Sequence, residues 1–316
     1  MREDDEAPLK TLLEQAWLPY ALCTLTMVFY AFSNAIGRGY YADLPPVAFS
    51  FWRVVAASAI LLPFVWVQLR RRWPVVVEHW RSLTLAAVLQ TGLGQVLFYW
   101  GLHTTTATNA SLITAAQPVA VVTFAWLLLR ERMTAVQGAG IAVAAAGVVV
   151  IVARGEPATL MGLDIVLGDL FAAIAVACWG LYAILIRRLT PVLTPFVMLE
   201  ALAVLSVVTT FPLYIAELAW SPQVMRVDAE TVAVIVGVAV FATILALSFM
   251  IYGIGRIGPA RASAFNYLQS PFTAVVAAIF LGEVFELYHA AGLALTLTGV
   301  YFANRPDRIR LGRRRA

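Results

Sequence analysis

Two stretches, "LRERMTAVQGAG" at residues 129–140 and "LGEVFELYHAAG" at residues 281–292, share a pattern that decides the fold. In each, a glutamate is followed nine residues later by a glycine, and a second glycine follows after seven more: Glu131, Gly140 and Gly147 in the first, Glu283, Gly292 and Gly299 in the second. The pattern indicates that the chain contains an internal repeat.

The composition places the chain in a lipid bilayer. Hydrophobic residues make up 61% of the 316 residues, charged residues 13%, and the mean hydropathy is +0.83. A water-soluble core of this length has no room for so much apolar surface. A bilayer core of ~30 Å needs roughly 20 apolar residues per helix. Ten stretches meet this requirement: 15–37, the stretch after Pro46, two within the uncharged 82–129, 133–153, 170–186, the stretch after Pro195, 231–255, 262–282 and 287–304.

The basic residues predict the orientation. With the N-terminus in the cytoplasm, 18 of the 22 Lys and Arg residues fall in inside segments, three fall outside, and Arg53 lies within a span. By the positive-inside rule both termini are cytoplasmic, including tails 1–16 and 305–316. The net charge of +4 is therefore a topology signal, and we expect no nucleic-acid partner.

The repeat extends over both halves of the chain. At an offset of 152 residues Thr91 matches Thr243, Gln117 matches Gln269 and Gly101 matches Gly253, while earlier in each half Pro46 and Pro63 match Pro195 and Pro212 at an offset of 149. Because each half holds five spans, an odd number, the second half enters the membrane from the opposite side. The sequence therefore predicts an all-α membrane protein with ten transmembrane helices as two inverted five-helix repeats, 17–153 and 165–304. Inverted repeats are characteristic of secondary transporters that work by alternating access.

The repeated glycines predict a packing seam. Gly140 and Gly147 lie on one face of the fifth span, and Gly292 and Gly299 lie on one face of the tenth. Small residues let helix backbones approach closely in lipid. We expect these four glycines to serve helix packing.

The order of these features resembles the EamA type of the drug/metabolite transporter superfamily over roughly residues 17–304. The motifs that carry the resemblance are "YAFSNAIGR" at 30–38, "CWGLYAILIRR" at 178–188, and the proline, glutamate and paired glycines across spans 4–5 and 9–10. One departure is that Trp179-Gly180 stands where the first half has Tyr30-Ala31. The resemblance implies a multi-pass carrier of the bacterial inner membrane, commonly an exporter of amino acids or related metabolites, with a central cavity formed mainly by helices 1, 3, 4, 6, 8 and 9.

Polar side chains at mid-depth are the candidate substrate ligands, because a polar group in hydrocarbon is costly unless it faces protein or water. The set near the span centres is Gln90, Thr91, Gln117, Trp179, Tyr182, Thr243, Gln269 and Ser270, and the set above and below it is Tyr30, Asn34, Gln95, Tyr99, Asn266 and Tyr267. The alternative for the threonines and glutamines is hydrogen bonding to neighbouring helices, which contributes ~0.6 kcal/mol each. Pro118 and Pro271 add carbonyls freed from helical hydrogen bonds beside the glutamines.

Two charges lie inside the expected spans, Arg53 and Glu200. Counting from Pro46 and Pro195, they lie ~10 and ~8 Å deep from opposite faces, so a direct ion pair is not expected. Each either reaches the nearer interface or has a function: attraction of anions at the outer mouth for Arg53, and proton coupling for Glu200. A third alternative pairs Glu200 with Arg187 or Arg188.

Other chemistries have little support in the sequence. It has no HExxH, GxSxG or Walker motif, and Cys23 and Cys178 lie within spans, so we expect neither enzymatic activity, nor a cofactor, nor a metal site. The alternatives to a carrier are an intramembrane enzyme using Glu200 or His103, and a channel or other membrane protein without coupled transport. The expected partners are a small-molecule substrate, the lipid bilayer and protons, with the chain a monomer or a dimer. The mostly neutral and aromatic mid-depth layer favours a small zwitterion over a polyanion.

Overall fold

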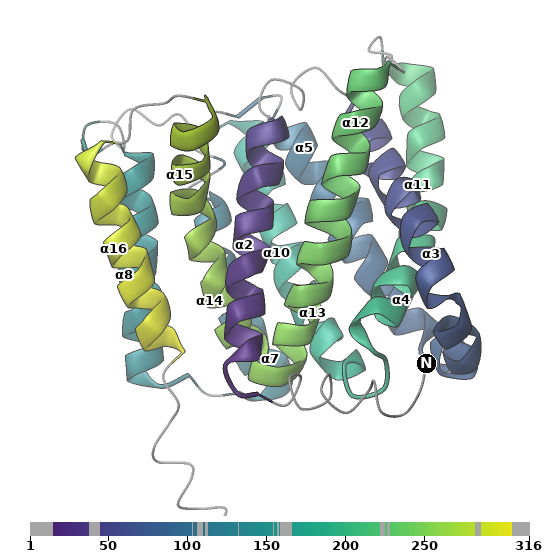
Figure 1. Ribbon diagram of the computed structural model, residues 1–316, viewed down its shortest axis with the longest axis horizontal. Coiled ribbons are helices and arrows are strands. Elements are labelled where there is room, and N and C mark those ends of the chain that lie inside the picture. Colours follow the sequence, from purple (N-terminus) through teal and green to yellow (C-terminus); the bar gives the residue numbers. More distant parts are fainter. Residues whose placement is uncertain are drawn as a thin grey trace, which may run out of the picture.

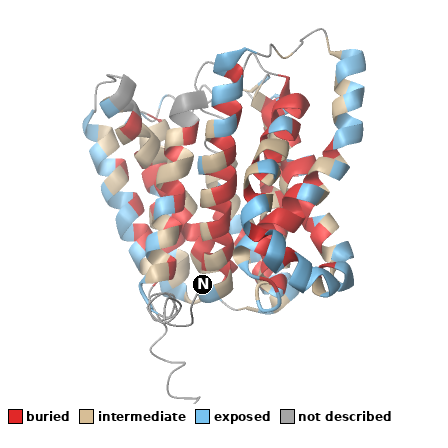
Figure 2. Cartoon of the chain, turned by 45° about the vertical axis from the view of Figure 1, so that its right-hand side comes forward, coloured by how far each residue is buried: buried red, intermediate tan, exposed pale blue. Residues whose placement is uncertain are grey.

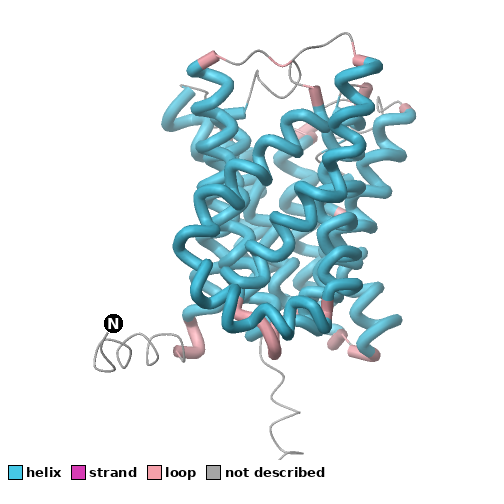
Figure 3. The backbone as a smooth tube through the Cα atoms, turned by 90° about the vertical axis from the view of Figure 1, so that its right-hand side faces the viewer, coloured by secondary structure: helices cyan, strands magenta, loops and turns pink. Residues whose placement is uncertain are grey.

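The fold is a bundle of helices that stand side by side (Figure 1). The computed structural model describes residues 15–37, 45–102, 104–105, 110, 113–131, 133–153, 155–156, 158, 166–221, 225, 228–281 and 286–304, and for residues 34–37, 277, 280 and 281 it describes the backbone alone. Every regular element in these ranges is helical, as Figure 3 shows.

The described elements of the first half are α2 (Leu18–Gly37), α3 (Pro46–Glu78), α4 (Trp80–Ala87), η2 (Val88–Gln95), α5 (Val96–Leu102), the short 113–115 turn of helix, α7 (Gln117–Leu129) and α8 (Ala135–Val152). The second half supplies α10 (Leu167–Leu189), α11 (Pro195–Trp220), α12 (Ala229–Val238), η3 (Ala239–Leu245), α13 (Ala246–Ile257), α14 (Pro259–Ala264), η4 (Phe265–Leu268), α15 (Gln269–Leu281) and α16 (Leu287–Ala303). Helix α2 begins and α16 ends at the same, lower edge of the bundle in Figure 1.

Within the described ranges, six continuous helices are long and apolar enough to cross a membrane: Pro46–Glu78, Trp80–Leu102, Ala135–Val152, Leu167–Leu189, Pro195–Trp220 and Ala229–Ile257. Shorter apolar helices accompany them at Leu18–Ser33, Ile113–Leu129 and Leu287–Ala303. The described part of the chain is thus all-helical, with the long apolar helices of a multi-pass membrane protein. The expected tails lie outside the described residues, apart from Gln15 and Ala16, and so do Glu283, His103 and residues 106–109 of the expected turn.

Local sequence sets the helix ends. Pro46 and Pro195 stand at the first positions of α3 and α11, where a missing N–H costs nothing. Thr134 and Gln137 form a capping box at the start of α8. Asp228 caps α12 by accepting a hydrogen bond from the Thr231 N–H at 2.7 Å.

The two halves of the chain are interleaved. Helix α8 packs along α16 and α3 along α11, so the corresponding helices of the two halves contact each other. Helix α2 packs on α13 and α15, while α10 packs on η2, α5 and α7. Glu217, near the end of α11, adds a polar tie, because its carboxylate accepts hydrogen bonds from Val47 N at 3.0 Å and Ala48 N at 2.6 Å at the start of α3.

The packing role expected of the four repeated glycines is confirmed, and the structure adds that their two helices, α8 and α16, pack on each other. A Cβ atom on Gly147 would lie 2.7 Å from the Gly292 carbonyl oxygen and 2.8 Å from Thr296 N, and one on Gly292 would lie 2.7 Å from the Gly147 carbonyl oxygen. A Cβ on Gly140 would similarly lie 2.7 Å from Gly299 O. The backbones of the two helices are therefore in direct contact, with no room for a side chain.

Two π-helical segments interrupt the long helices at related places. In η2 the Val96 N–H bonds to Thr91 O, and after η3 the Ala246 N–H bonds to Phe241 O, five residues back in each case. Thr91 and Thr243 lie in these segments and are buried. Such segments frequently occur at functional sites.

Burial follows the bundle rather than a water-soluble surface. Buried residues occupy its centre, and exposed residues cover its periphery and ends (Figure 2). Many of the exposed side chains are large and apolar, among them Phe64, Trp126, Val208, Phe211 and Ile279. This distribution matches a lipid-facing surface.

Candidate substrate cavity

A cavity of about 620 Å³ lies among the helices of both halves. Its wall is formed by residues of α2, α3, η2, α5, α7, α8, α10, α12, η3, α13, α14, η4, α15 and α16, together with Ala110 and the 113–115 turn. The volume suits a small metabolite, since ligand pockets typically measure ≈300–1,000 Å³.

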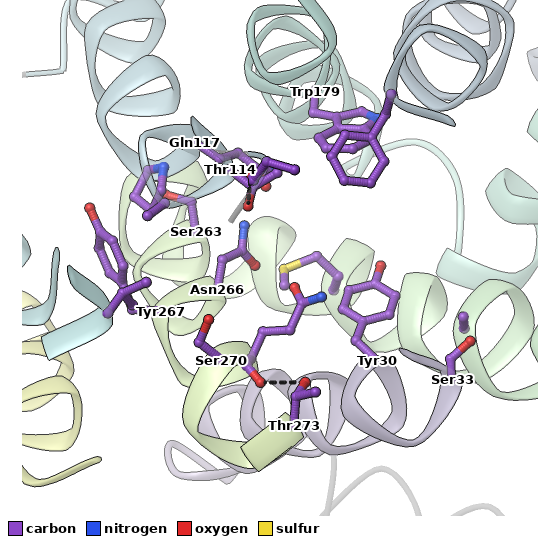
Figure 4. A pocket seen from close by; sticks show the side chains of 18 of the residues that line it. Tyr30, Ser33, Thr114, Gln117, Trp179, Ser263, Asn266, Tyr267, Ser270 and Thr273 are labelled. Carbon is purple, nitrogen blue, oxygen red and sulfur yellow. Dashed lines mark hydrogen bonds between the residues drawn. The ribbon is translucent and has the colours of Figure 1, made fainter. Parts of the chain in front are cut away.

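Most of the expected ligand residues reach this cavity. Its wall includes Tyr30, Gln90, Gln95, Tyr99, Gln117, Trp179, Tyr182, Asn266 and Gln269, and also Tyr267 and Ser270. In Figure 4, Gln117, Asn266 and Ser270 come from different segments and border one open space, with Tyr30 and Trp179 on its other side. The cavity is also lined by residues that were not expected from the sequence: Ser33, Phe98, Thr114, Ser263 and Thr273. Their signal in the sequence was weak, because serine and threonine are common in membrane helices.

Three expected residues are not placed on the wall. Thr91 and Thr243 are buried in the π-helical segments and do not line the cavity. Thr91 Oγ1 accepts a hydrogen bond of 3.2 Å from the Ser206 hydroxyl of α11. The extra residue in each π turn changes which side chains of the helix face the cavity. The depth of the two threonines in the membrane was therefore not enough to predict whether they line it. The side chain of Asn34 lies outside the described part of α2.

Trp179 lies close to the backbone of η2. Its indole Nε1 donates a hydrogen bond of 3.2 Å to the carbonyl oxygen of Gln90, and its ring centroid lies 5.3 Å from that of Phe98. A Cβ atom on Gly94 would lie 2.5 Å from Trp179 Nε1, so glycine at position 94 permits this approach. Trp179, which stands where the first half of the chain has Tyr30, thus gives the cavity an aromatic wall that is hydrogen-bonded to the first half.

The broken helices on either side of the glutamines place more polar groups on the wall. Pro118 and Pro271 have no N–H to bond the carbonyls four residues earlier, which belong to Thr114 and Tyr267, and both of these residues line the cavity. The hydroxyl oxygens of Tyr182 and Tyr267 are buried and have no hydrogen-bond partner in the described part of the chain. Unpartnered polar atoms beside a cavity are groups that a substrate can satisfy.

Arg53 lies in the wall of the cavity, with its side chain buried inside the bundle. Only 7% of its surface is exposed, and its Nη2 donates a hydrogen bond of 3.2 Å to Gln95 Oε1. The interpretation that Arg53 extends to the nearer interface is therefore wrong. A count of residues along a helix gives depth but not the face of the helix, and Arg53 is on the inner face of α3.

Glu200 is fully buried between α11 and α3, away from the cavity wall. The Ser58 hydroxyl of α3 donates a hydrogen bond of 2.5 Å to Glu200 Oε1, and Oε2 has no partner among the described residues. Arg187 instead donates to the carbonyls of Ile254 and Gly255, and Arg188 donates to that of Leu128. Two of the roles considered for Glu200 are therefore wrong: its carboxylate does not extend to water, and it does not pair with Arg187 or Arg188.

The arrangement defines a class of protein: a multi-pass helical membrane protein with a polar and aromatic cavity in the middle of the bundle, which is the architecture of a membrane transporter. The profile of the EamA-like transporter family matches residues 17–153 and again residues 166–305. The chain belongs to this family.

Similar proteins carry related descriptions. A probable terminal-alkyne amino-acid exporter of Streptantibioticus cattleyicolor is 34% identical over 244 residues, which cover 74% of this chain and 76% of that protein. The uncharacterized transporter YyaM of Bacillus subtilis is 26% identical, with 86% and 87% covered. A solved crystal structure that matches with a TM-score of 0.73 is 19% identical and covers 94% of this chain and 98% of that one, so it supports the fold alone. The family and these relatives are transporters rather than enzymes.

Proposed function

We propose that the protein is a secondary-active carrier that exports amino acids or related small metabolites by alternating access across the bacterial inner membrane. The observation that carries this proposal is the interleaving of the two halves around one cavity. Helices α2 and α10 make corresponding contacts, α2 with α13 and α15 and α10 with α5 and α7, while α8 pairs with α16 and α3 with α11. Two near-equivalent halves provide two near-equivalent packings, one open to each side.

The finer architecture belongs to the same proposal. Residues 17–153 and 165–304 form two inverted five-helix repeats with ten transmembrane helices, and both terminal tails, 1–16 and 305–316, lie in the cytoplasm. The distribution of basic residues supports this orientation. The probable amino-acid exporter among the relatives supports the substrate class. The substrate ligands are the cavity-lining members of the expected set, the coupling candidate is Glu200, and the coupling ion is the proton.

The proposal is tested with purified protein in proteoliposomes that are preloaded with unlabelled amino acids or N-acyl amino acids. A carrier gives saturable uptake of radiolabelled substrate that is accelerated by substrate on the opposite side. Flux without saturation or acceleration would indicate a channel and contradict alternating access. Conversion of the substrate to a product of different mass would contradict transport altogether.

Replacing Gln117 or Gln269 with alanine should lower the rate of counterflow roughly 3- to 10-fold, because each change removes a hydrogen-bonding group from the cavity wall. The melting temperature should change little, since both side chains are partly exposed. Gln68→Ala is the matched control, because Gln68 is exposed on α3 and does not line the cavity. A loss of thermal stability as large as the loss of flux would assign both glutamines to packing.

A further inference from the structure

The cavity wall has an unequal distribution of charge. Among the described residues that line the cavity there is one arginine, Arg53, and there is no lysine, aspartate or glutamate. The remaining polar groups are amides, hydroxyls, the Trp179 indole and His289. The wall therefore presents a permanent positive charge with no neutralising carboxylate, because arginine keeps its proton at any physiological pH.

The guanidinium of Arg53 is incompletely satisfied. Of its five N–H donors, the bonds given by the described residues satisfy one, from Nη2 to Gln95 Oε1, while Nε is buried and has no partner among these residues. A charge that is more than nine-tenths buried is stable only when it is paired or fully hydrogen-bonded. The described contacts of Arg53 supply one neutral acceptor, which leaves the charge itself without a counter-ion.

The Gln95 contact also holds the guanidinium in place. Gln95 ends η2, and Phe98 and Tyr99, one turn further along α5, line the same cavity. The Tyr99 ring packs against Phe49 of α3 with a centroid distance of 5.5 Å, which joins α5 to the turn of α3 just before Arg53. A fixed, planar fork of donors is suited to a carboxylate, which it can bind through two parallel hydrogen bonds.

We propose that Arg53, oriented by Gln95, binds the carboxylate of the substrate, and that the carrier consequently prefers carboxylic acids of net negative charge over zwitterions. This inference rests on the proposed transport of amino acids or related metabolites and specifies which of them bind best. An amino acid brings an ammonium group that finds only neutral acceptors on the described wall. The same acid with its amino group acylated neutralises Arg53 and leaves no second charge unpaired. The aromatic groups near this end, Phe98 and Trp179, can contact its apolar side chain.

The test uses three probes that share one side chain, compared at about pH 6: N-acetyl-L-phenylalanine, L-phenylalanine and L-phenylalanine methyl ester, with net charges of about −1, 0 and +1. Binding is measured as stabilisation of the purified protein against heat, over a concentration series, and transport is measured in proteoliposomes with the same compounds. The expected order of affinity is acetylated acid, then amino acid, then ester, with the acid at least roughly tenfold tighter than the ester.

Arg53→Gln should weaken binding of the acetylated acid roughly 10- to 100-fold and leave the ester nearly unchanged, so that the preference disappears. Arg53→Lys keeps the charge without the fork and should retain part of the preference, which gives a second measurement if the glutamine variant folds poorly. Arg70→Gln is the matched control, because Arg70 is an exposed arginine on the same helix.

The outcomes separate this inference from the proposed function. Equal binding of the three probes, or an Arg53→Gln variant that weakens all three to the same extent, would overturn the carboxylate site even if saturable flux is observed. Anion-selective binding that depends on Arg53, without saturable flux of any compound, would instead support the site and contradict the carrier mechanism.

Discussion

Gly147→Leu is expected to separate α8 from α16 and to prevent recovery of most of the folded protein. A Cβ atom alone at this position would lie 2.7 Å from Gly292 O and 2.8 Å from Thr296 N, and these are backbone atoms that cannot rotate away. Forcing side-chain atoms into a filled contact costs typically 1–3 kcal/mol, and more where the backbone must move. In lipid, close packing is a main source of helix association, so the lost contact is not replaced. We expect a melting temperature lower by roughly 10 °C and a large aggregated fraction in size-exclusion chromatography.

The chain offers a matched control on another helix. A Cβ atom on Gly237 of α12 would meet nothing within 4 Å. Gly237→Ala should therefore be neutral or slightly stabilising, by up to about 1 kcal/mol from helix propensity, whereas Gly147→Ala should already destabilise. Equal melting temperatures for the two alanine variants would show that the seam contributes nothing to stability.

Glu200→Gln is expected to abolish substrate movement driven by a proton gradient while preserving exchange of substrate. Glutamine has nearly the same shape as glutamate and can still accept the Ser58 hydrogen bond, but it cannot bind and release a proton. For one proton per substrate, a gradient of one pH unit supports up to about tenfold accumulation, and this accumulation should fall to about one in the variant. The measurement is substrate accumulation in proteoliposomes with an imposed pH difference, followed by counterflow without one.

Glu200 lies between α3 and α11 rather than on the cavity wall, which constrains how such coupling would work. Ser58 lies five residues after Arg53, about 7.5 Å further along α3, so protonation of Glu200 would act on the cavity through this helix. Glu217→Gln makes the same substitution on α11 at a residue that caps α3, and it should leave the pH profile of transport unchanged. An unchanged pH profile in Glu200→Gln itself would limit this residue to holding the two helices together.

Much of the fold follows from the sequence because the bilayer restricts the alternatives. Apolar stretches of the required length predicted the six long and three shorter apolar helices found in the described part of the chain, since backbone groups in lipid must be satisfied within a helix. Glycines at seven-residue spacing predicted close packing on one face of α8 and one face of α16, because that spacing keeps them on one helix face. The pairing of these two faces with each other came from the structure. Gln117 and Gln269 were placed near the cavity by symmetry and depth, and both line it.

Side-chain direction could not be predicted in the same way. Depth along α3 suggested that Arg53 was a charge at the outer mouth, while its actual environment depends on the contact with Gln95 across two helices. The partner of Glu200 could not be predicted either, because Ser58, which donates a hydrogen bond to it, is far away in the sequence and belongs to no recognisable motif. Thr91 and Thr243 were expected on the wall from their depth in the membrane. This expectation failed because a single sequence does not reveal where a helix departs from regular α-helical geometry.

The π-helical segment η2 holds one residue more than a regular α-helix needs to join the same two turns, because its Val96 N–H bonds five residues back, to Thr91 O. Loss of one residue inside this segment would therefore let the hydrogen-bond ladder close as regular α-helix while α4 and α5 keep their relative orientation. Phe98 and Tyr99 would then stay on the cavity wall. Loss of one residue from the regular helix α5 would instead turn everything after it by about 100°. The π-helical segment is thus the place in this helix where a relative of this protein can differ in length by one residue without turning the helix away from its substrate.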